Sequence, residues 1–289
     1  MQDELEIQVR TLDDSYAFVD LSAYRKTVVK GSVAARWLND LVTAGIEGLS
    51  GDEATRSLLL TPTGRVLADF HVIRWGDGFL LIQDLEQPAP VTRLLVPYVL
   101  SSDVSLKDRT MDLALFAVPG SGAESADLAG SRPSILGPGV DVIVDAGKAD
   151  KTRGALVKKN LVEVSRDAAE IWRIRRGIPR FPMDFGPDSI PAEAGLEDVI
   201  DFTKGCFLGQ ESVAKVRNLG HPPRVVLPAL ADGRVAVGER LFLEGEDVGK
   251  ITSAARVQDR TAVLARVRWG LKAAALSVAD GRRLSPHRG

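Results

Sequence analysis

The stretch ATRSLLLTPTGRVLADFHVIRWGDGFLLIQD, residues 54–84, decides the fold class. Apolar, β-rich runs at 57–60, 65–74 and 78–83 are separated by the turn sequences TPTG and GDG. This punctuation predicts strand, turn, strand, turn, strand. Helical spacing occurs on both sides of the stretch, but helices and strands do not alternate as a regular βαβ series. The pattern therefore favours an α+β protein over a doubly wound sheet.

Helices are predicted on both sides of these strands. One helix should begin after Ser32, which can cap its free amides, and should stop at Gly45. Apolar spacing predicts two more, within residues 89–100 and within 165–179, the latter capped by Ser165. Further strands are predicted at residues 103–108, 112–120 and 140–147.

The C-terminal part of the chain has a different pattern. From about residue 224, short alternating runs are cut by Gly and Asp, which predicts a small antiparallel barrel of about 65 residues. The sequence HPPR at 221–224 is typical of a linker. We therefore predict two domains, 1–220 with two α+β lobes and 225–289 with the barrel. Residues 119–139, rich in Gly, Ser and Pro, predict a long surface connection.

Composition narrows the classes of function. The chain has 289 residues and a net charge of −2, from 37 basic and 39 acidic side chains, so its overall charge does not favour nucleic acid or an anionic membrane. The N-terminus lacks the pattern of a secretory signal, and the apolar runs are too short to span a bilayer. The single cysteine cannot form an internal disulfide. A cytoplasmic location is expected.

That cysteine lies in KGCFLGQE, residues 204–211. A reactive thiolate needs a nearby positive charge, which Lys204 could supply, and Gly205 could allow a tight turn. No histidine shares a local pattern with Cys206, which disfavours a Cys-His hydrolase. One cysteine cannot hold structural zinc or a stable cluster alone. A reactive thiol and a buried small residue both remain open for Cys206.

Two further segments carry candidate chemistry. Asp69, on the strand after TPTG, is either a solvated strand residue or a carboxylate that binds or protonates a nitrogen atom of a ligand. Residues 173–198, RIRRGIPRFPMDFGPDSIPAEAGLED, combine arginines with several acids, and could equally be a solvated helix end and acidic loop. No phosphate loop, HExxH, CxxC or nucleophile elbow is present. These residues alone do not name a reaction.

Taken in order, five segments resemble the YgfZ branch of the glycine-cleavage T-protein superfamily. The eight residues KGCFLGQE match the signature of that branch, Lys-Gly-Cys-aromatic-x-Gly-Gln-Glu. The resemblance spans nearly the whole chain. The other four segments are VVKGSVAARWLNDLVTAGIEGL (28–49), LLLTPTGRVLADFHV (58–72), RIRRGIPRFPMDFGPDSIPAEAGL (173–196) and VGKITSAA (248–255).

This resemblance implies a three-lobed body around a central folate channel, with an antiparallel β-barrel at one end. It implies a tetrahydrofolate-binding factor in the assembly or repair of iron–sulfur clusters in client enzymes, including tRNA-modifying ones. The expected partners are folate and iron–sulfur client or assembly proteins. The alternative is a tetrahydrofolate-dependent aminomethyl- or methyltransferase. A binding module for tRNA or a partner protein is a third possibility, but the near-neutral charge disfavours direct contact with nucleic acid.

The resemblance also implies roles for single residues. Glu193 matches a glutamate that binds the pterin ring, because a carboxylate can accept two parallel hydrogen bonds from it. Asp69 matches one member of an acidic pair, whose other position is Ala68 here, and this disfavours aminomethyl transfer. The predicted cofactor-binding residues are Glu193, Asp69, Arg173, Gln210 and Glu211. The predicted catalytic residues are Cys206, Lys204 and Asp69, and no metal site is predicted.

Overall fold

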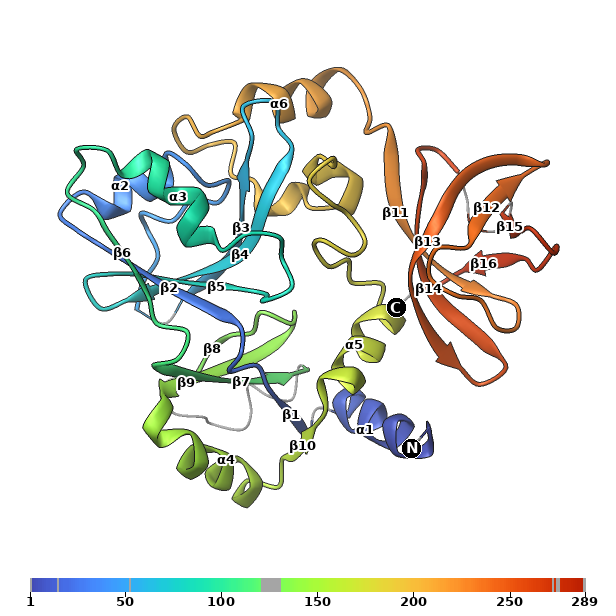
Figure 1. The fold of residues 1–289 in the computed structure, drawn as a ribbon, viewed down its shortest axis with the longest axis horizontal. Helices are drawn as coiled ribbons and strands as arrows, with labels where there is room; N and C mark the ends of the chain where they lie inside the picture. Colours follow the sequence, from blue (N-terminus) through green and yellow to red (C-terminus); the bar gives the residue numbers. More distant parts are fainter. Residues whose placement is uncertain are drawn as a thin grey trace. The chain divides into compact units, whose positions relative to one another are not determined.

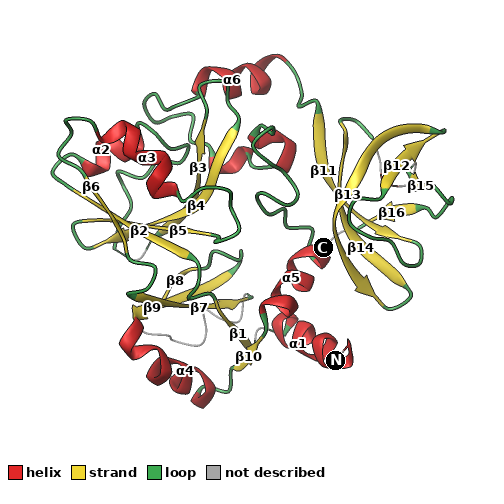
Figure 2. Ribbon diagram, viewed as in Figure 1, coloured by secondary structure: helices red, strands yellow, loops and turns green. Residues whose placement is uncertain are grey.

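The computed structural model describes residues 2–14, 16–51, 53–120, 131–271, 273 and 276–287. Helices and strands are mixed along the chain (Figures 1 and 2), which confirms the predicted α+β class. None of the described helices is long and apolar enough to cross a membrane. The chain forms two compact units, one of Met1–Leu60, Leu67–Ala169 and Val199–Leu208, the other of Thr61–Val66, Glu170–Asp198 and Gly209–Gly289. The domain limits 1–220 and 225–289 stay a prediction.

The first unit contains a five-stranded sheet in the order β3-β4-β5-β2-β6 (Figure 1). Three of these strands confirm the prediction from residues 54–84. β5 pairs antiparallel with both β4 and β2. All six residues of β5 are buried, as expected for a central strand. The strands are β3 (Ala54–Leu60), β4 (Val66–Trp75), β5 (Gly78–Gln83), β2 (Arg25–Lys30) and β6 (Ser105–Asp108).

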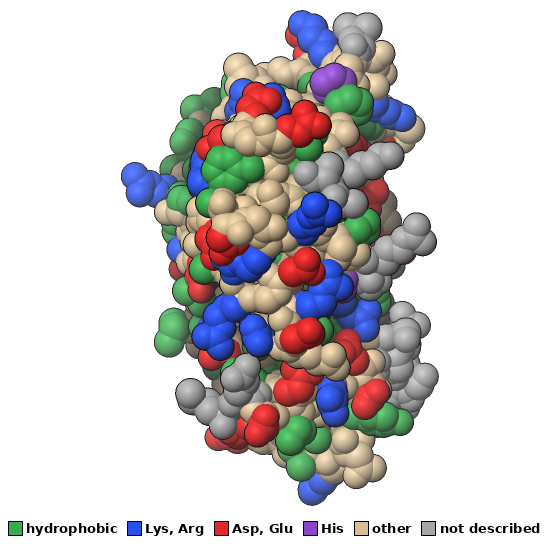
Figure 3. Space-filling view, turned by 90° about the vertical axis from the view of Figure 1, so that its right-hand side faces the viewer, with side chains coloured by type: hydrophobic (Ala, Val, Ile, Leu, Met, Phe, Trp, Pro, Cys, Tyr) green, Lys and Arg blue, Asp and Glu red, His purple; other side chains and the backbone are tan. Residues whose placement is uncertain are grey.

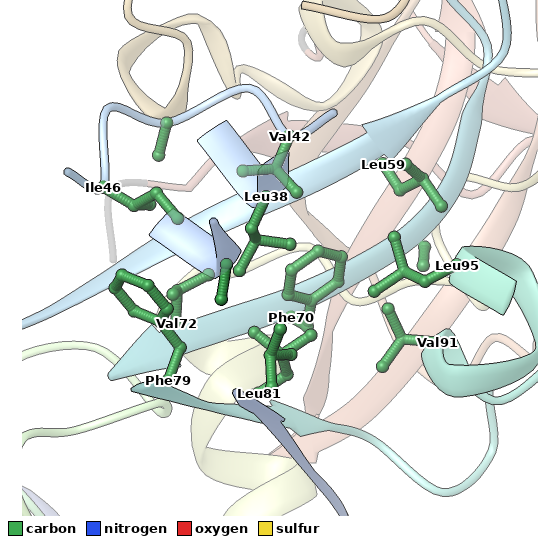
Figure 4. Packing of buried hydrophobic residues seen from close by; sticks show 14 residues of the cluster. Leu38, Val42, Ile46, Leu59, Phe70, Val72, Phe79, Leu81, Val91 and Leu95 are labelled. Carbon is green, nitrogen blue, oxygen red and sulfur yellow. The ribbon is translucent and has the colours of Figure 1, made fainter. Parts of the chain in front are cut away.

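Two helices, α2 (Ala34–Asn39) and α3 (Val91–Val99), supply side chains to the apolar core of this sheet. Leu38 of α2, Leu95 of α3 and Phe70 of β4 belong to one buried cluster (Figure 4). Burying a side chain of this size stabilises the fold by about 1.5–3 kcal/mol. The core therefore fixes the strand that carries Asp69 and the segment that follows α2.

Helix α2 begins after Ser32, as predicted, but neither the predicted cap nor the predicted stop is present. The N-cap is Val33 without a side-chain hydrogen bond, because the Ser32 hydroxyl donates to the carboxylate of Asp103 at 2.6 Å instead. The helix ends at Asn39, well before Gly45. A Cβ atom at Gly45 would lie 2.4 Å from Oδ2 of Asp201, so the glycine permits close approach of a distant segment rather than a helix stop.

A second sheet of the first unit has the order β10-β1-β7-β9-β8. β1 pairs parallel with β10 and antiparallel with β7. In its core the rings of Phe18 and Phe116 meet edge to face, with centroids 5.9 Å apart. Its elements are α1 (Gln2–Asp13), β1 (Ala17–Asp20), β7 (Leu113–Pro119), β8 (Ser131–Pro133), β9 (Gly139–Asp145), α4 (Ala149–Lys158) and β10 (Val162–Val164).

The predicted long connection at 119–139 is only partly a loop. Residues 121–130 lie outside the described residues, but β8 pairs antiparallel with β9. Asp141 of β9 is fully buried and accepts hydrogen bonds from the Ser134 hydroxyl at 2.7 Å and the Ile135 N–H at 3.0 Å. Burial raises the pKa of Asp141 to about 7, although these hydrogen bonds oppose the rise.

This carboxyl group should make stability fall as pH rises. Because the pKa is higher in the folded chain, the folded state binds more protons, and the stabilisation present below about pH 4 is lost as pH rises through about 7. Between about pH 5 and pH 8, the wild-type chain should lose about 2–4 kcal/mol more free energy of unfolding than Asp141→Asn. Urea titrations at the two pH values measure this difference. The exposed Asp145→Asn is the control, and parallel pH profiles for wild type and Asp141→Asn would refute the expectation.

The second unit contains the predicted C-terminal barrel. Six strands follow in the order β15-β12-β13-β14-β11-β16, with antiparallel pairing between neighbours. The edges are joined by a bridge between Ser277 and Arg283 and by a hydrogen bond from the Leu284 N–H to the Leu276 carbonyl at 2.9 Å. The strands are β11 (Arg224–Ala231), β12 (Arg240–Leu243), β13 (Glu246–Val257), β14 (Arg260–Arg268), β15 (Ser277–Val278) and β16 (Leu284–Pro286).

Helix α5 (Arg166–Arg175) confirms the helix predicted within 165–179. The Ala168 N–H donates to the Ser165 hydroxyl at 3.2 Å, so the predicted cap is present. Near the other end of α5, Ile174 packs with Ala255 and Ala262 of the barrel strands. A 3-10 helix, Pro191–Ala194, and helix α6 (Gln210–Leu219) complete the elements that carry predicted site residues.

Candidate functional site

The loop with the single cysteine belongs to the first unit. Cys206 is exposed, which rules out its interpretation as a buried small residue. The next side chain, Phe207, is buried, and Leu208 packs against the core cluster of the first sheet. The thiol is therefore presented to solvent from a loop whose following residues are anchored. Among the described residues, no group of three or more His, Cys, Asp or Glu side chains could hold a metal ion.

Lys204 is held by main-chain oxygen atoms. Its Nζ donates to the carbonyls of Asn39, Val42 and Ala44, the last at 3.0 Å, and lies 5.2 Å from the centre of the Phe207 ring. These three bonds use all the N–H donors of an ammonium group. Burial lowers the pKa of Lys204 to about 8, while nearby carboxylates, led by Asp201, oppose the fall. This geometry favours an anchoring role over the predicted electrostatic help to the thiol.

The rest of the loop is fixed by Asp201. Its Oδ1 accepts hydrogen bonds from the Thr203 N–H and hydroxyl, at 2.8 and 2.6 Å, and from the Lys204 N–H at 3.2 Å. The Asp201 N–H donates to the carbonyl of Thr43 at 3.0 Å. Gly205 has no left-handed backbone, and a Cβ atom there would meet nothing within 4 Å. Gly205 does lie in a run of bends, 202–205, but this turn does not require a glycine.

Gln210 and Glu211 are the first two residues of α6, in the second unit. The residue before them, Gly209, has φ 84°, a left-handed conformation that suits glycine. Glu211 is exposed and pairs with Lys215 at 2.9 Å, and this hydrogen bond lowers the pKa of the carboxyl group. Contact of Gln210 and Glu211 with a cofactor stays a prediction.

Asp69 lies on β4, as predicted, and is almost fully buried. Both of its carboxylate oxygens accept hydrogen bonds from Arg56, Nε to Oδ1 at 2.9 Å and Nη2 to Oδ2 at 2.6 Å. On the same strand, burial and then the charge of Arg56 lower the pKa of His71 to about 4. The bidentate pair favours a structural role for Asp69 over proton transfer to a ligand.

Glu193 is the strongest candidate for ligand binding. It lies in the 3-10 helix Pro191–Ala194, with its side chain fully buried. Its Oε2 accepts hydrogen bonds from Arg266, Nη2 at 2.8 Å and Nε at 3.2 Å, and lies 3.3 Å from Nε of Arg224. Its Oε1 is buried and has no hydrogen-bond partner among the described residues. A buried carboxylate oxygen normally accepts a hydrogen bond, so Oε1 marks a place for a donor.

The two arginines come from neighbouring barrel strands. Arg266 of β14 lies opposite Val226 of β11, and Arg224 is two residues from Val226, so both arginines lie on the same face of the sheet. They also bind Asp188, and the hydrogen bond from Arg266 is the main reason that the pKa of Asp188 is lowered. Sequence reasoning missed both arginines. No local pattern could show that they share a face, because alternation applies within one strand and the register between β11 and β14 comes from the structure.

The Arg173 side chain is buried in the second unit and is hydrogen-bonded to protein groups there. Nε and Nη2 donate to Glu170, Nη1 donates to Asp184 at 2.7 Å and to the carbonyl of Ile178, and Nη2 also donates to Ser253. All five guanidinium N–H groups therefore have partners in the protein. The geometry favours a structural role for Arg173 over the predicted contact with a cofactor.

Comparison with known proteins agrees with this fold. The GCVT N-terminal domain family matches residues 1–129. The iron-sulfur cluster assembly factor IBA57 homolog of Pyricularia oryzae is 27% identical over 243 residues, which cover 80% of this chain and 61% of that protein. The tRNA-modifying protein YgfZ of Vibrio vulnificus is 26% identical over 207 residues, which cover 66% of this chain and 62% of that protein. The matches thus span less than two thirds of either relative.

A solved structure shows the same architecture over nearly the whole chain. The glycine cleavage system aminomethyltransferase T from Bartonella henselae gives a TM-score of 0.84 at 18% identity, over 98% of this chain and 88% of that chain. The fold is therefore that of the aminomethyltransferase T-proteins. In sequence and in fold, the chain is thus similar to YgfZ/GcvT-like proteins.

Proposed function

We propose that this protein is a tetrahydrofolate-binding factor that acts in the assembly or repair of iron–sulfur clusters in client enzymes, including tRNA-modifying ones. Folate binding is proposed because Oε1 of Glu193 is buried and has no hydrogen-bond partner among the described residues. The other oxygen, Oε2, already interacts with Arg266 and Arg224. The 2-amino group and N3–H of a pterin ring are donors of the kind that such an oxygen accepts.

The residues present fit such a ligand. Glu193 would hold the pterin ring, and Arg224 and Arg266 would keep the carboxylate in place. Tetrahydrofolate, when bound, would supply a reduced, electron-rich pterin ring. Because Oε2 already has three N–H groups within 3.3 Å, the ligand would donate to Oε1 rather than to both oxygens. This refines the predicted pair of parallel hydrogen bonds.

Cys206 supports the iron–sulfur part of the proposal. The thiol is exposed, so it can meet a cluster, a sulfur species or a thiol of a partner protein. Two relatives are named for cluster assembly and for tRNA modification, which agrees with this role. Basic and acidic side chains are interspersed on the surface drawn in Figure 3, and the net charge is −2. Contact with client or assembly proteins is therefore favoured over direct binding of nucleic acid.

The alternative is a tetrahydrofolate-dependent aminomethyl- or methyltransferase. The solved aminomethyltransferase structure is 18% identical to this chain, so that likeness shows the fold alone. A transferase would need a carboxylate free to polarise a folate nitrogen, and Asp69 has both oxygens bound to Arg56. The alternative would gain support if methylene- or methyl-tetrahydrofolate formed during incubation with one-carbon donors.

Ligand-induced stabilisation tests folate binding directly. At a concentration 100 times its dissociation constant, tetrahydrofolate should raise the free energy of unfolding by about 2.7 kcal/mol. p-Aminobenzoylglutamate, which lacks the pterin ring, is the matched control and should give a much smaller shift. Equal stability with and without tetrahydrofolate would remove the folate part of the proposal.

Complementation tests the thiol. In a strain that lacks this gene, the wild-type chain should restore the activity of iron–sulfur enzymes, and Cys206→Ala should not. Because Cys206 is exposed, the substitution leaves no cavity and should change stability by less than about 0.5 kcal/mol. Full restoration by Cys206→Ala would remove the proposed role of the thiol.

A further inference from the structure

Three main-chain carbonyls converge where α2 ends. Asn39 is the last residue of that helix, and Val42 and Ala44 lie three and five residues further on, outside the helix. Carbonyls at a helix C-terminus have no partner within the helix and must find one elsewhere. For Asn39 the partner is the Nζ of Lys204, which also donates to the carbonyls of Val42 and Ala44. We call these three oxygens the carbonyl cage.

The cage and the cysteine loop are joined by more than one contact. The Thr43 hydroxyl donates to the carbonyl of Val199 at 3.0 Å, and the Asp201 N–H donates to the carbonyl of Thr43. Gly45 leaves room for the Asp201 carboxylate. Segments 39–45 and 199–204, both in the first unit, therefore pack against each other, and the Lys204 ammonium group is hydrogen-bonded between them.

Cys206 lies between two anchored residues. On one side Lys204 is bound in the carbonyl cage, and on the other Phe207 is buried, with its ring 5.2 Å from the same Nζ. None of the contacts described for Lys204 involves the thiol. The lysine therefore acts on the path of the main chain through residues 204–207.

We propose that Lys204 is a positioning residue for Cys206 and that its ammonium group is a tethered cation in a site built from main-chain carbonyls. The site takes a small cation with several N–H donors, and free ammonium is the matching ligand when the side chain is removed. The planar guanidinium of arginine does not fit three converging oxygens. The positioning role rests on the proposed function, because it matters only if the Cys206 thiol acts on a partner.

The test uses the full-length Lys204→Ala variant, with Lys215→Ala as control because Lys215 is a surface lysine of the adjoining helix. Hydrogen exchange of the amides in 199–208 and the alkylation rate of Cys206 by iodoacetamide are measured in ammonium chloride and in tetramethylammonium chloride at equal ionic strength. A lost hydrogen bond from a charged group predicts exchange about tenfold faster or more in Lys204→Ala. Ammonium should reverse most of this increase, and tetramethylammonium, which has no N–H, should not.

Each outcome decides the matter. Protection restored by ammonium, or a variant that folds only in ammonium, supports the carbonyl cage. Unchanged exchange in Lys204→Ala overturns it, whether client activity is lost or kept. Equal rescue by both salts also overturns it, because the effect would then be ionic strength. If Cys206→Ala restores client activity, the proposed function of the thiol fails, and the exchange data still decide the role of Lys204.

Discussion

Replacing Glu193 with glutamine is expected to weaken tetrahydrofolate binding by about a hundredfold, because about 3 kcal/mol of charge-assisted hydrogen bonding is lost. Arg266 and Arg224 should enforce this loss. They donate at the position of Oε2, so the amide oxygen of glutamine would turn toward them. The amide nitrogen would then lie where Oε1 lies now, and its N–H groups would face the N–H groups of the pterin. Isothermal titration of both proteins measures the change.

Glu197→Gln is the matched control for this substitution. Glu197 lies four residues further along the same segment and is exposed, so its change to glutamine should leave the dissociation constant within about twofold. Circular dichroism of ligand-free Glu193→Gln checks that the fold persists. Equal affinities for wild type and Glu193→Gln would show that the folate, if bound, does not contact this carboxylate.

Replacing Arg173 with methionine is expected to lower the free energy of unfolding by about 3–5 kcal/mol. Its partner Asp184 is completely buried, and Oδ2 accepts the Nη1–H of Arg173 at 2.7 Å. The hydroxyls of Thr252 and Ser253 would still donate to Oδ1. The buried carboxylate would then lose the charged donor that Arg173 supplies, and a buried charge without a compensating partner is costly. Urea-induced unfolding measures the loss.

Two further variants separate this effect from the loss of packing. Arg240→Met breaks the exposed pair between Arg240 and Asp247 and should cost less than about 1 kcal/mol. The double variant Arg173→Met, Asp184→Asn removes both charges and should recover part of the lost stability. If Arg173→Met and Arg240→Met cost the same, the buried pair has no special weight in this fold.

Local pattern was enough to predict the sheet strands and the barrel. The runs at 57–60, 65–74 and 78–83 became β3, β4 and β5 because alternation and turn residues act over a few positions. The Ser165 cap was predictable for the same reason. Ser32 failed as a cap because Asp103, 71 residues away, competes for its hydroxyl. A helix cap predicted from sequence forms only where no residue remote in sequence but close in space competes for the capping side chain.

The candidate sites were predictable in their central residues and not in their surroundings. Resemblance indicated Glu193, but its arginine partner Arg266 is 73 residues away in sequence, on a barrel strand. The sequence indicated Lys204 because it lies two residues from Cys206. The carbonyl groups that it binds lie 160 to 165 residues earlier in the chain. Main-chain oxygens carry no sequence signal. The sequence therefore indicates that a lysine matters without indicating that it is an anchor.

The two compact units have a consequence for synthesis of the chain. Each is assembled from three segments, so the chain crosses from one unit to the other five times. On a ribosome, neither unit could be completed early. The first would wait for Val199–Leu208, and the second, begun with Thr61–Val66, would wait for the barrel. The last crossing falls between Leu208 and Gly209, within KGCFLGQE itself, so the first unit can close only after this motif has been translated and has left the ribosome.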